Sequence, residues 1–152
     1  LLPEVLNILD VVADRDVVLS SGHLNISEIW PLFDEAKKRG VRRMICNHPT
    51  FVVGASLADI TRLAGMGVYI EHSMCMFAEN SKFRMFDPET LRGLIEAAGV
   101  DRTILGSDLG QAGNPRLVDG FLSVIEICLD LGYTEAQVRK MVSTNAATLI
   151  GL

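Results

Sequence analysis

The chain has 152 residues, of which 49% are hydrophobic and 22% are charged, and these proportions exclude a disordered segment and fit one globular domain. Fourteen Lys and Arg against nineteen Asp and Glu give a net charge of -5 without any basic run, which argues against a nucleic-acid partner. No apolar stretch approaches the ~18 residues of a membrane span, and the three cysteines have no metal-like spacing. We therefore expect a cytoplasmic protein that contacts neither nucleic acid nor a membrane.

The apolar residues alternate between helical spacing and short continuous runs. Helical spacing after Pro3 predicts a first helix that begins there. Capping residues predict two further helix starts, with Ser27 as one N-cap and Asp87, followed by Pro88, as another. The predicted strands cover residues 16–20, 41–46, 68–70 and 103–105. After the first helix, the predicted helices cover residues 28–39, 56–66, 88–98 and 116–131, a segment from 134 with capping-box spacing, and 145–152.

This strict alternation of strands and helices predicts a parallel sheet covered by helices, in the α/β class. We expect residues 1–152 to form a single domain of four β-α units followed by C-terminal helices. Two architectures fit that order. One is an open doubly wound sheet, and the other is the C-terminal half of a (β/α)8 TIM barrel, whose usual length is ~250 residues.

Residues that can bind a metal or transfer a proton follow all four predicted strands. His23, His48 and His72 come directly after the first three strands, and Asp108 follows the fourth. In both architectures the active site lies at the carboxyl ends of the strands. Imidazoles and a carboxylate that meet there suit Zn²⁺ or a similar divalent cation. The sequence thus predicts a metal site formed by His23, His48 and Asp108.

Other features of the strand ends narrow the chemistry. No lysine lies at a strand end, which argues against a Schiff base, and the loop from Gly110 to Gly113 lacks a phosphate-binding spacing. Each predicted ligand also has a purely structural alternative, such as a histidine bonded to a loop carbonyl or an aspartate that caps a turn. Glu71 and His72 are adjacent, so only one of them can face the site. The weaker candidates for substrate contact are Glu71, His72, Gln111 and Asn114.

Three strand-end motifs and the last helix together resemble the amidohydrolase superfamily, and most closely an uncharacterised hydrolase-like branch of it. The similarity covers nearly the whole chain, as the fifth to eighth strands of the barrel with their helices. The segments that carry it are Ser21-Gly22-His23-Leu24, Asn47-His48-Pro49, Gly106-Ser107-Asp108-Leu109-Gly110-Gln111 and Asn145-Ala146-Ala147-Thr148-Leu149-Ile150-Gly151-Leu152.

The resemblance implies a metal-dependent hydrolase with a TIM-barrel fold. His23 and His48 would be metal ligands, and Asp108 would bind the metal or its water and act as the general base. The family reaction is attack by metal-activated water on a carbonyl or related electrophile of a small-molecule substrate. The family's His-x-His pair on the first strand and its fourth-strand ligand have no counterpart here, so the chain carries at most half of that metal site.

An unclosed half-barrel leaves two sheet edges and an apolar inner face uncovered. We therefore expect a fragment of a longer barrel, partnered by an N-terminal half-barrel or by another copy in a homo-oligomer. Two alternatives to the hydrolase remain open. The chain could be a metal-free relative that binds a small ligand at the same place, or a doubly wound domain with a regulatory role.

Overall fold

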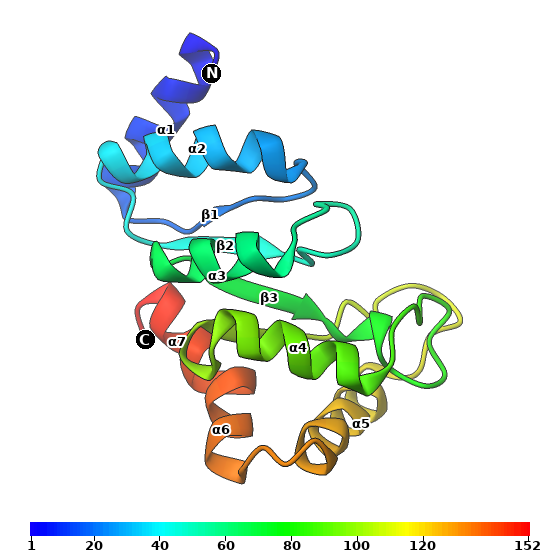
Figure 1. Cartoon of the computed structure of the whole chain (residues 1–152). Helices are drawn as coiled ribbons and strands as arrows, with labels where there is room; N and C mark the ends of the chain where they lie inside the picture. Colours follow the sequence, from blue (N-terminus) through cyan, green and yellow to red (C-terminus); the bar gives the residue numbers. More distant parts are fainter.

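The structure is a computed structural model that describes residues 1–152, and it contains one four-stranded parallel sheet (Figure 1). The strand order is β1-β2-β3-β4, so each strand pairs with the next one along the chain. This order has no reversal, and a reversal is the defining feature of a doubly wound sheet. The predicted parallel α/β class is confirmed. The strands are β1 (Leu19–Ser20), β2 (Met44–Asn47), β3 (Tyr69–Ser73) and β4 (Thr103–Gly106).

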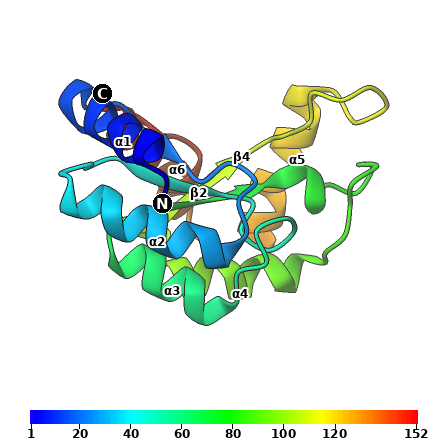
Figure 2. The ribbon, with the colours of Figure 1, turned by 90° about the horizontal axis from the view of Figure 1, so that it is seen from above.

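Helices connect the strands and cover both faces of the sheet to different extents. Figure 2 shows α2, α3 and α4 along one side of the sheet and the C-terminus on the other. No helix is long and apolar enough to cross a membrane. The helices are α1 (Pro3–Arg15), α2 (Ile26–Lys38), α3 (Leu57–Gly65), α4 (Pro88–Ala98), α5 (Leu117–Asp130), α6 (Glu135–Arg139) and α7 (Asn145–Ile150), with 3-10 turns η1 (Met74–Met76) and η2 (Val100–Arg102) and a π-helical turn η3 (Lys140–Thr144).

The main core lies between the sheet and helices α2 to α4. Cys46, Ile70 and Leu105 of the sheet are buried in the same cluster as Phe33 of α2 and Ile60 of α3. Successive residues of a strand point to opposite faces of the sheet. The residues that neighbour Cys46, Ile70 and Leu105 along their strands therefore point to the other face.

The second face of the sheet is apolar at one end and polar at the other. Tyr69 and Ile104 are covered there by Leu149 of α7. Further toward the carboxyl ends of the strands, the same face carries Asn47 and Glu71, which are register partners of one another. The C-terminal helix therefore covers the apolar half of this face, and the polar half stays open for a site.

Some predicted boundaries are confirmed and others are wrong. Asp87 caps α4, and Thr134 and Gln137 form a capping box at the start of α6, as predicted. Asn25 rather than Ser27 caps α2, so that helix begins at Ile26 and not at residue 28.

The third strand is longer than predicted. It runs to Ser73, so Glu71 and His72 lie within it and not after it.

Candidate active site

His23 and His48 lie side by side at the carboxyl ends of β1 and β2. Their rings are stacked, with centroids 4.7 Å apart and an angle of 13° between the ring planes. His48 has a φ of 29° and Asp108, which follows β4, has a φ of 47°. Residues other than glycine seldom adopt such positive φ values, although Asp and His do so more often than most, as Asp16 does at the end of α1.

His23, His48 and Asp108 line two cavities in common. One cavity has a volume of about 140 Å³ and is mainly apolar. The other has a volume of about 280 Å³ and contains no hydrophobic lining residue, because Asn47, Glu71 and Ser73 complete it. The structure thus brings the three predicted metal-site residues together where a polar and an apolar space meet.

A row of hydrogen bonds crosses the polar cavity from β1 to β3. Ser20 Oγ donates to Asn47 Oδ1 over 2.6 Å, and Asn47 Nδ2 donates to Glu71 Oε2 over 3.4 Å. The Ser73 hydroxyl and the His48 backbone N–H also donate to the Glu71 carboxyl group, over 3.3 and 3.4 Å. These bonds fix the Glu71 carboxyl group at the base of the polar cavity.

Burial sets the protonation behaviour of Glu71 and His48. Burial raises the pKa of Glu71, and the negative charge of Asp108 adds to this effect, while the hydrogen bonds to the carboxyl group oppose it. Burial also lowers the pKa of His48, and the nearby His23 lowers it further. His48 is therefore neutral at pH 7, the state in which an imidazole can bind a metal or accept a proton.

Asp108 is exposed to the cavity and is held by only two long contacts. The Cys75 thiol donates to Asp108 Oδ2 over 3.6 Å, and Gln111 Nε2 donates to Oδ1 over 3.4 Å. Burial and the Asp108 charge raise the pKa of the Cys75 thiol to about 12. Cys75 is thus a neutral thiol at pH 7 and not a thiolate nucleophile.

The weaker predicted contacts are distributed differently. Glu71 lines the polar cavity and Gln111 lines the apolar one. His72 lines neither, because its side chain is 1% exposed and lies on the opposite side of β3 from Glu71. Asn114 also lies outside both cavities, where its Nδ2 donates to Gln111 Oε1 and its Oδ1 accepts from the Lys82 backbone N–H.

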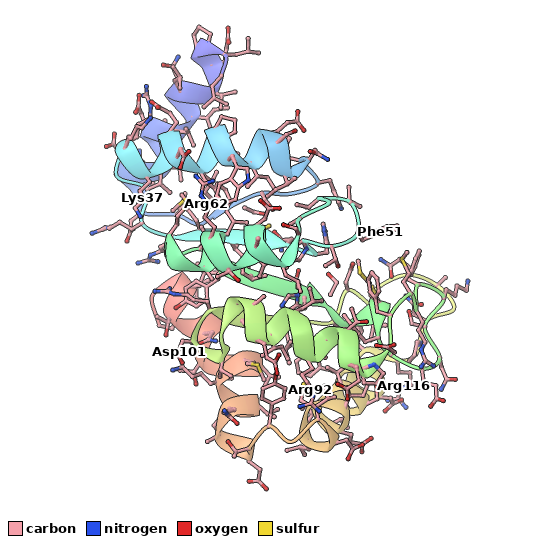
Figure 3. The ribbon with its side chains drawn as sticks, viewed as in Figure 1. Lys37, Phe51, Arg62, Arg92, Asp101 and Arg116 are labelled. Atoms are coloured by element: carbon pink, nitrogen blue, oxygen red, sulfur yellow. The ribbon has the colours of Figure 1, made fainter.

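Sequence reasoning missed the apolar lining of the site. Phe51 and Val52 come from the loop after β2, and Phe83 and Met85 come from the loop after β3. Figure 3 shows Phe51 on its loop, at the end of the sheet where the long loops gather. The available signal was large apolar side chains within otherwise polar loops that directly follow strands.

The donor types at this site fit a divalent cation, although the chain does not complete a metal centre. Two imidazoles and a carboxylate are suitable ligands for Zn²⁺, and His48 Nδ1 is a buried atom without a hydrogen-bond partner. However, no group of three or more His, Cys, Asp or Glu side chains is placed to hold one ion. The side chains are therefore suitable in type for a cation, but their placement does not by itself form a metal site.

The fold and these cavities define an α/β protein with its candidate site at the carboxyl ends of parallel strands. Residues 1–71 match a family of unknown function (DUF6282), which is just under half of the chain. No curated protein matches the sequence.

The fold is similar to the crystal structure of a proposed 2-pyrone-4,6-dicarboxylic acid hydrolase from Pseudomonas putida, with a TM-score of 0.62 and 17% sequence identity. The match covers 99% of this chain and 59% of that one, so the chain spans somewhat more than half the length of its structural neighbour. At this identity the likeness concerns the fold alone.

Proposed function

We propose that the chain forms the C-terminal half of a (β/α)8 barrel that hydrolyses a small carbonyl compound, with the chemistry of the amidohydrolase superfamily. The observation that carries this proposal is the meeting of His23, His48 and Asp108 around one space at the strand ends. The sequential strand order and the structural neighbour support the barrel.

In this proposal His23 and His48 would be ligands of a divalent cation, with Zn²⁺ as the expected ion, Asp108 would act on its water, and the rest of the barrel would contribute the remaining ligands. When bound, such a cation lowers the pKa of water to about 7 and polarises a carbonyl oxygen. The residues of this chain then orient the reactants and move the proton.

Asp108 is the proposed general base. Its carboxylate takes a proton from the attacking water while the water oxygen adds to the carbonyl carbon. The bond to the leaving group then breaks, and Asp108 returns the proton to the leaving atom. Gln111 and Cys75 direct the carboxylate toward the cavity through the contacts described above.

The test is the Asp108→Asn variant, assayed in the assembled barrel at measured metal content. Asparagine keeps the size of the side chain but cannot accept a proton near pH 7, so we expect kcat to fall by about 10²–10⁴-fold. His48→Ala is the matched comparison and should lower the metal content first. Turnover of Asp108→Asn within about threefold of the parent, at equal metal content, would reject the assigned role.

A second function is favoured by the absence of a three-ligand cluster. The chain would then be a metal-free domain that binds a small molecule in the same cavities. Metal analysis of the purified protein distinguishes the two functions, because only the hydrolase requires an ion in proportion to its activity.

A further inference from the structure

The loop that carries His23 is held by Asn47, the last residue of β2. Asn47 Oδ1 accepts from Ser20 Oγ over 2.6 Å, and Ser20 Oγ accepts from the Gly22 backbone N–H over 3.1 Å. The Asn47 backbone N–H donates to Ser21 Oγ over 3.2 Å. The two residues before His23 are therefore both tied to Asn47, one through its side chain and the other through its backbone.

The same asparagine is tied to the loop that carries His48 through the carboxyl group of Glu71. Asn47 Nδ2 and the His48 backbone N–H both donate to Glu71 Oε2, each over 3.4 Å. His48 has a φ of 29°, and a backbone in such a sparsely populated conformation persists where neighbouring contacts hold it. The bond to Glu71 is a contact of this kind, because its donor is the His48 backbone itself. One carboxylate oxygen thus joins the two loops that carry the histidines.

Glu71 is placed firmly enough to anchor both loops. It is 9% exposed, and the absence of a side chain at Gly106 leaves the space that its carboxyl group occupies. The Ser73 hydroxyl lies 3.3 Å from both carboxyl oxygens, within hydrogen-bonding distance. A rotation of the carboxyl group would break bonds from three different residues, so the anchor resists displacement.

The two imidazole rings depend on this anchor for their position. A histidine that binds a metal is usually oriented by a hydrogen bond at its second ring nitrogen. His48 Nδ1 is buried and has no such partner, so the place of the ring depends on the backbone that carries it. The rings of His23 and His48 are stacked with centroids 4.7 Å apart, and that distance is set by how far apart their two loops are held.

We propose that Asn47 and Glu71 are positioning residues, which set the separation of His23 and His48 by tying both loops to one carboxyl group. They act through the backbone of the loops and not by contact with reacting atoms. This role differs from the substrate contact that the sequence predicted for Glu71. It rests on the proposed function for the use of the two imidazoles as metal ligands, but the positioning itself is measured without metal or substrate.

Nuclear magnetic resonance of the histidine-labelled chain measures the ring positions directly. The chain has three histidines, and only His23 and His48 have stacked rings. We expect a nuclear Overhauser effect between these two rings in the parent chain. Asn47→Ala breaks the link between the two loops and should lose the effect.

Variants on either side of Asn47 test each link separately. Ser20→Ala breaks the link to the His23 loop only, so it should weaken the effect and leave the signal of the His48 backbone N–H in place. Glu71→Ala should lose the effect and shift the His48 backbone signal. Glu71→Gln keeps an oxygen that accepts from the His48 backbone N–H, and its amide group can donate to Ser73, so it should retain the effect.

Two controls separate positioning from a general loss of structure. Ile70→Val shortens a buried side chain of β3, the strand that carries Glu71, and should keep the effect although it lowers stability. Asn7→Ala makes the same chemical change as Asn47→Ala at an exposed position of α1 and should also keep it. If Asn47→Ala does not fold, Ser20→Ala and the two Glu71 variants still decide the matter.

Metal binding provides a second measurement, with Zn²⁺ alone as the probe. In the assembled barrel, Glu71→Ala should weaken Zn²⁺ binding by about 10–100-fold, whereas Glu71→Gln should stay within about threefold of the parent. An absent effect between the rings in the parent overturns the proposal, and so does an effect that persists in Glu71→Ala or is lost in Glu71→Gln. If the variants behave as expected while the assembled barrel holds no metal, the positioning role stands and the metal-dependent hydrolase is rejected.

Discussion

His72 is a buried imidazole whose two ring nitrogens have no hydrogen-bond partner. Its burial lowers the pKa from 6.5 to about 4, so the unfolded chain binds a proton between these pH values and the folded chain does not. The free energy of unfolding must therefore decrease as the pH falls from about 6.5 toward 4. A shift of this size corresponds to roughly 3 kcal/mol.

The expected result is that His72→Leu removes most of this pH dependence, because leucine is apolar and does not titrate. Denaturant unfolding at pH 7.5 and pH 4.5 measures the difference. Ile70→Val serves as the control, since it changes a buried side chain of the same strand that does not titrate, and that variant should keep the pH dependence of the parent. An equal loss of stability at low pH in His72→Leu would show that other groups cause it.

Individual site residues differed in how well the sequence could place them. His23, His48 and Asp108 follow buried strands, and parallel strands end at the same edge, so their common location follows from the order of elements alone. Phe51 and Phe83 belong to loops whose course depends on other loops. Asn114, for example, accepts from the Lys82 backbone and so joins the loop after β4 to the loop after β3. Contacts between loops leave no periodic pattern in the sequence from which they could be predicted.

At the level of single elements, the start of α2 shows how a cap is selected. Asn25 Oδ1 accepts from the Ser27 backbone N–H over 3.0 Å, and Glu28 accepts from the Asn25 backbone N–H over 3.0 Å. Three residues after Ser27 stands Trp30, which cannot return such a bond. The capping-box rule, applied to both candidates, would have selected Asn25.

The two candidate caps can be compared directly by substitution. Asn25→Ala should lower the free energy of unfolding by about 1 kcal/mol, because alanine has no side-chain oxygen to accept from the Ser27 backbone N–H. Ser27→Ala should cost much less, since the Ser27 hydroxyl only donates to Asn25. Urea unfolding of both variants is the measurement, and a larger loss in Ser27→Ala would return the cap to the residue predicted from the sequence.

The extension of β3 shows where sequence patterns stop being informative. Glu71, His72 and Ser73 are polar, which is typical of the end of a strand, yet all three are buried and paired within the sheet. Neighbouring strands and the loops above them bury these positions. A single sequence does not show that burial, so the local pattern predicted an earlier end.

At the scale of the whole molecule, exposed apolar surface and open sheet edges favour association with another chain. Leu117, Val118, Leu122 and Leu129 of α5 are 40% to 64% exposed. β1 and β4 each pair on one side only, so the sheet has two open edges. Surfaces of this kind favour association.

We expect the 152-residue chain to associate with itself when no other half-barrel is present. Sedimentation velocity over a range of concentrations should show a sedimentation coefficient that rises with concentration. The Val118→Glu/Leu122→Glu double variant should reduce that rise, because it places charges on the exposed face of α5. A single monomeric species with a cooperative thermal transition at all concentrations would contradict this expectation.

Gly106 has no side chain, and the Glu71 carboxyl group occupies the space that a Cβ atom would fill. The effect of a substitution at residue 106 therefore depends on which residue stands at position 71. A Cβ atom at residue 106 would collide with Glu71 Oε1, so Gly106→Ala must displace a carboxyl group that Ser73, Asn47 and the His48 backbone hold in place. In a Glu71→Ser background the same alanine has nothing to displace. A double-mutant cycle by denaturant unfolding should give a coupling energy of about 1 kcal/mol between the two positions. Descendants of this chain would therefore gain a side chain at residue 106 more readily after the acid at residue 71 had been lost.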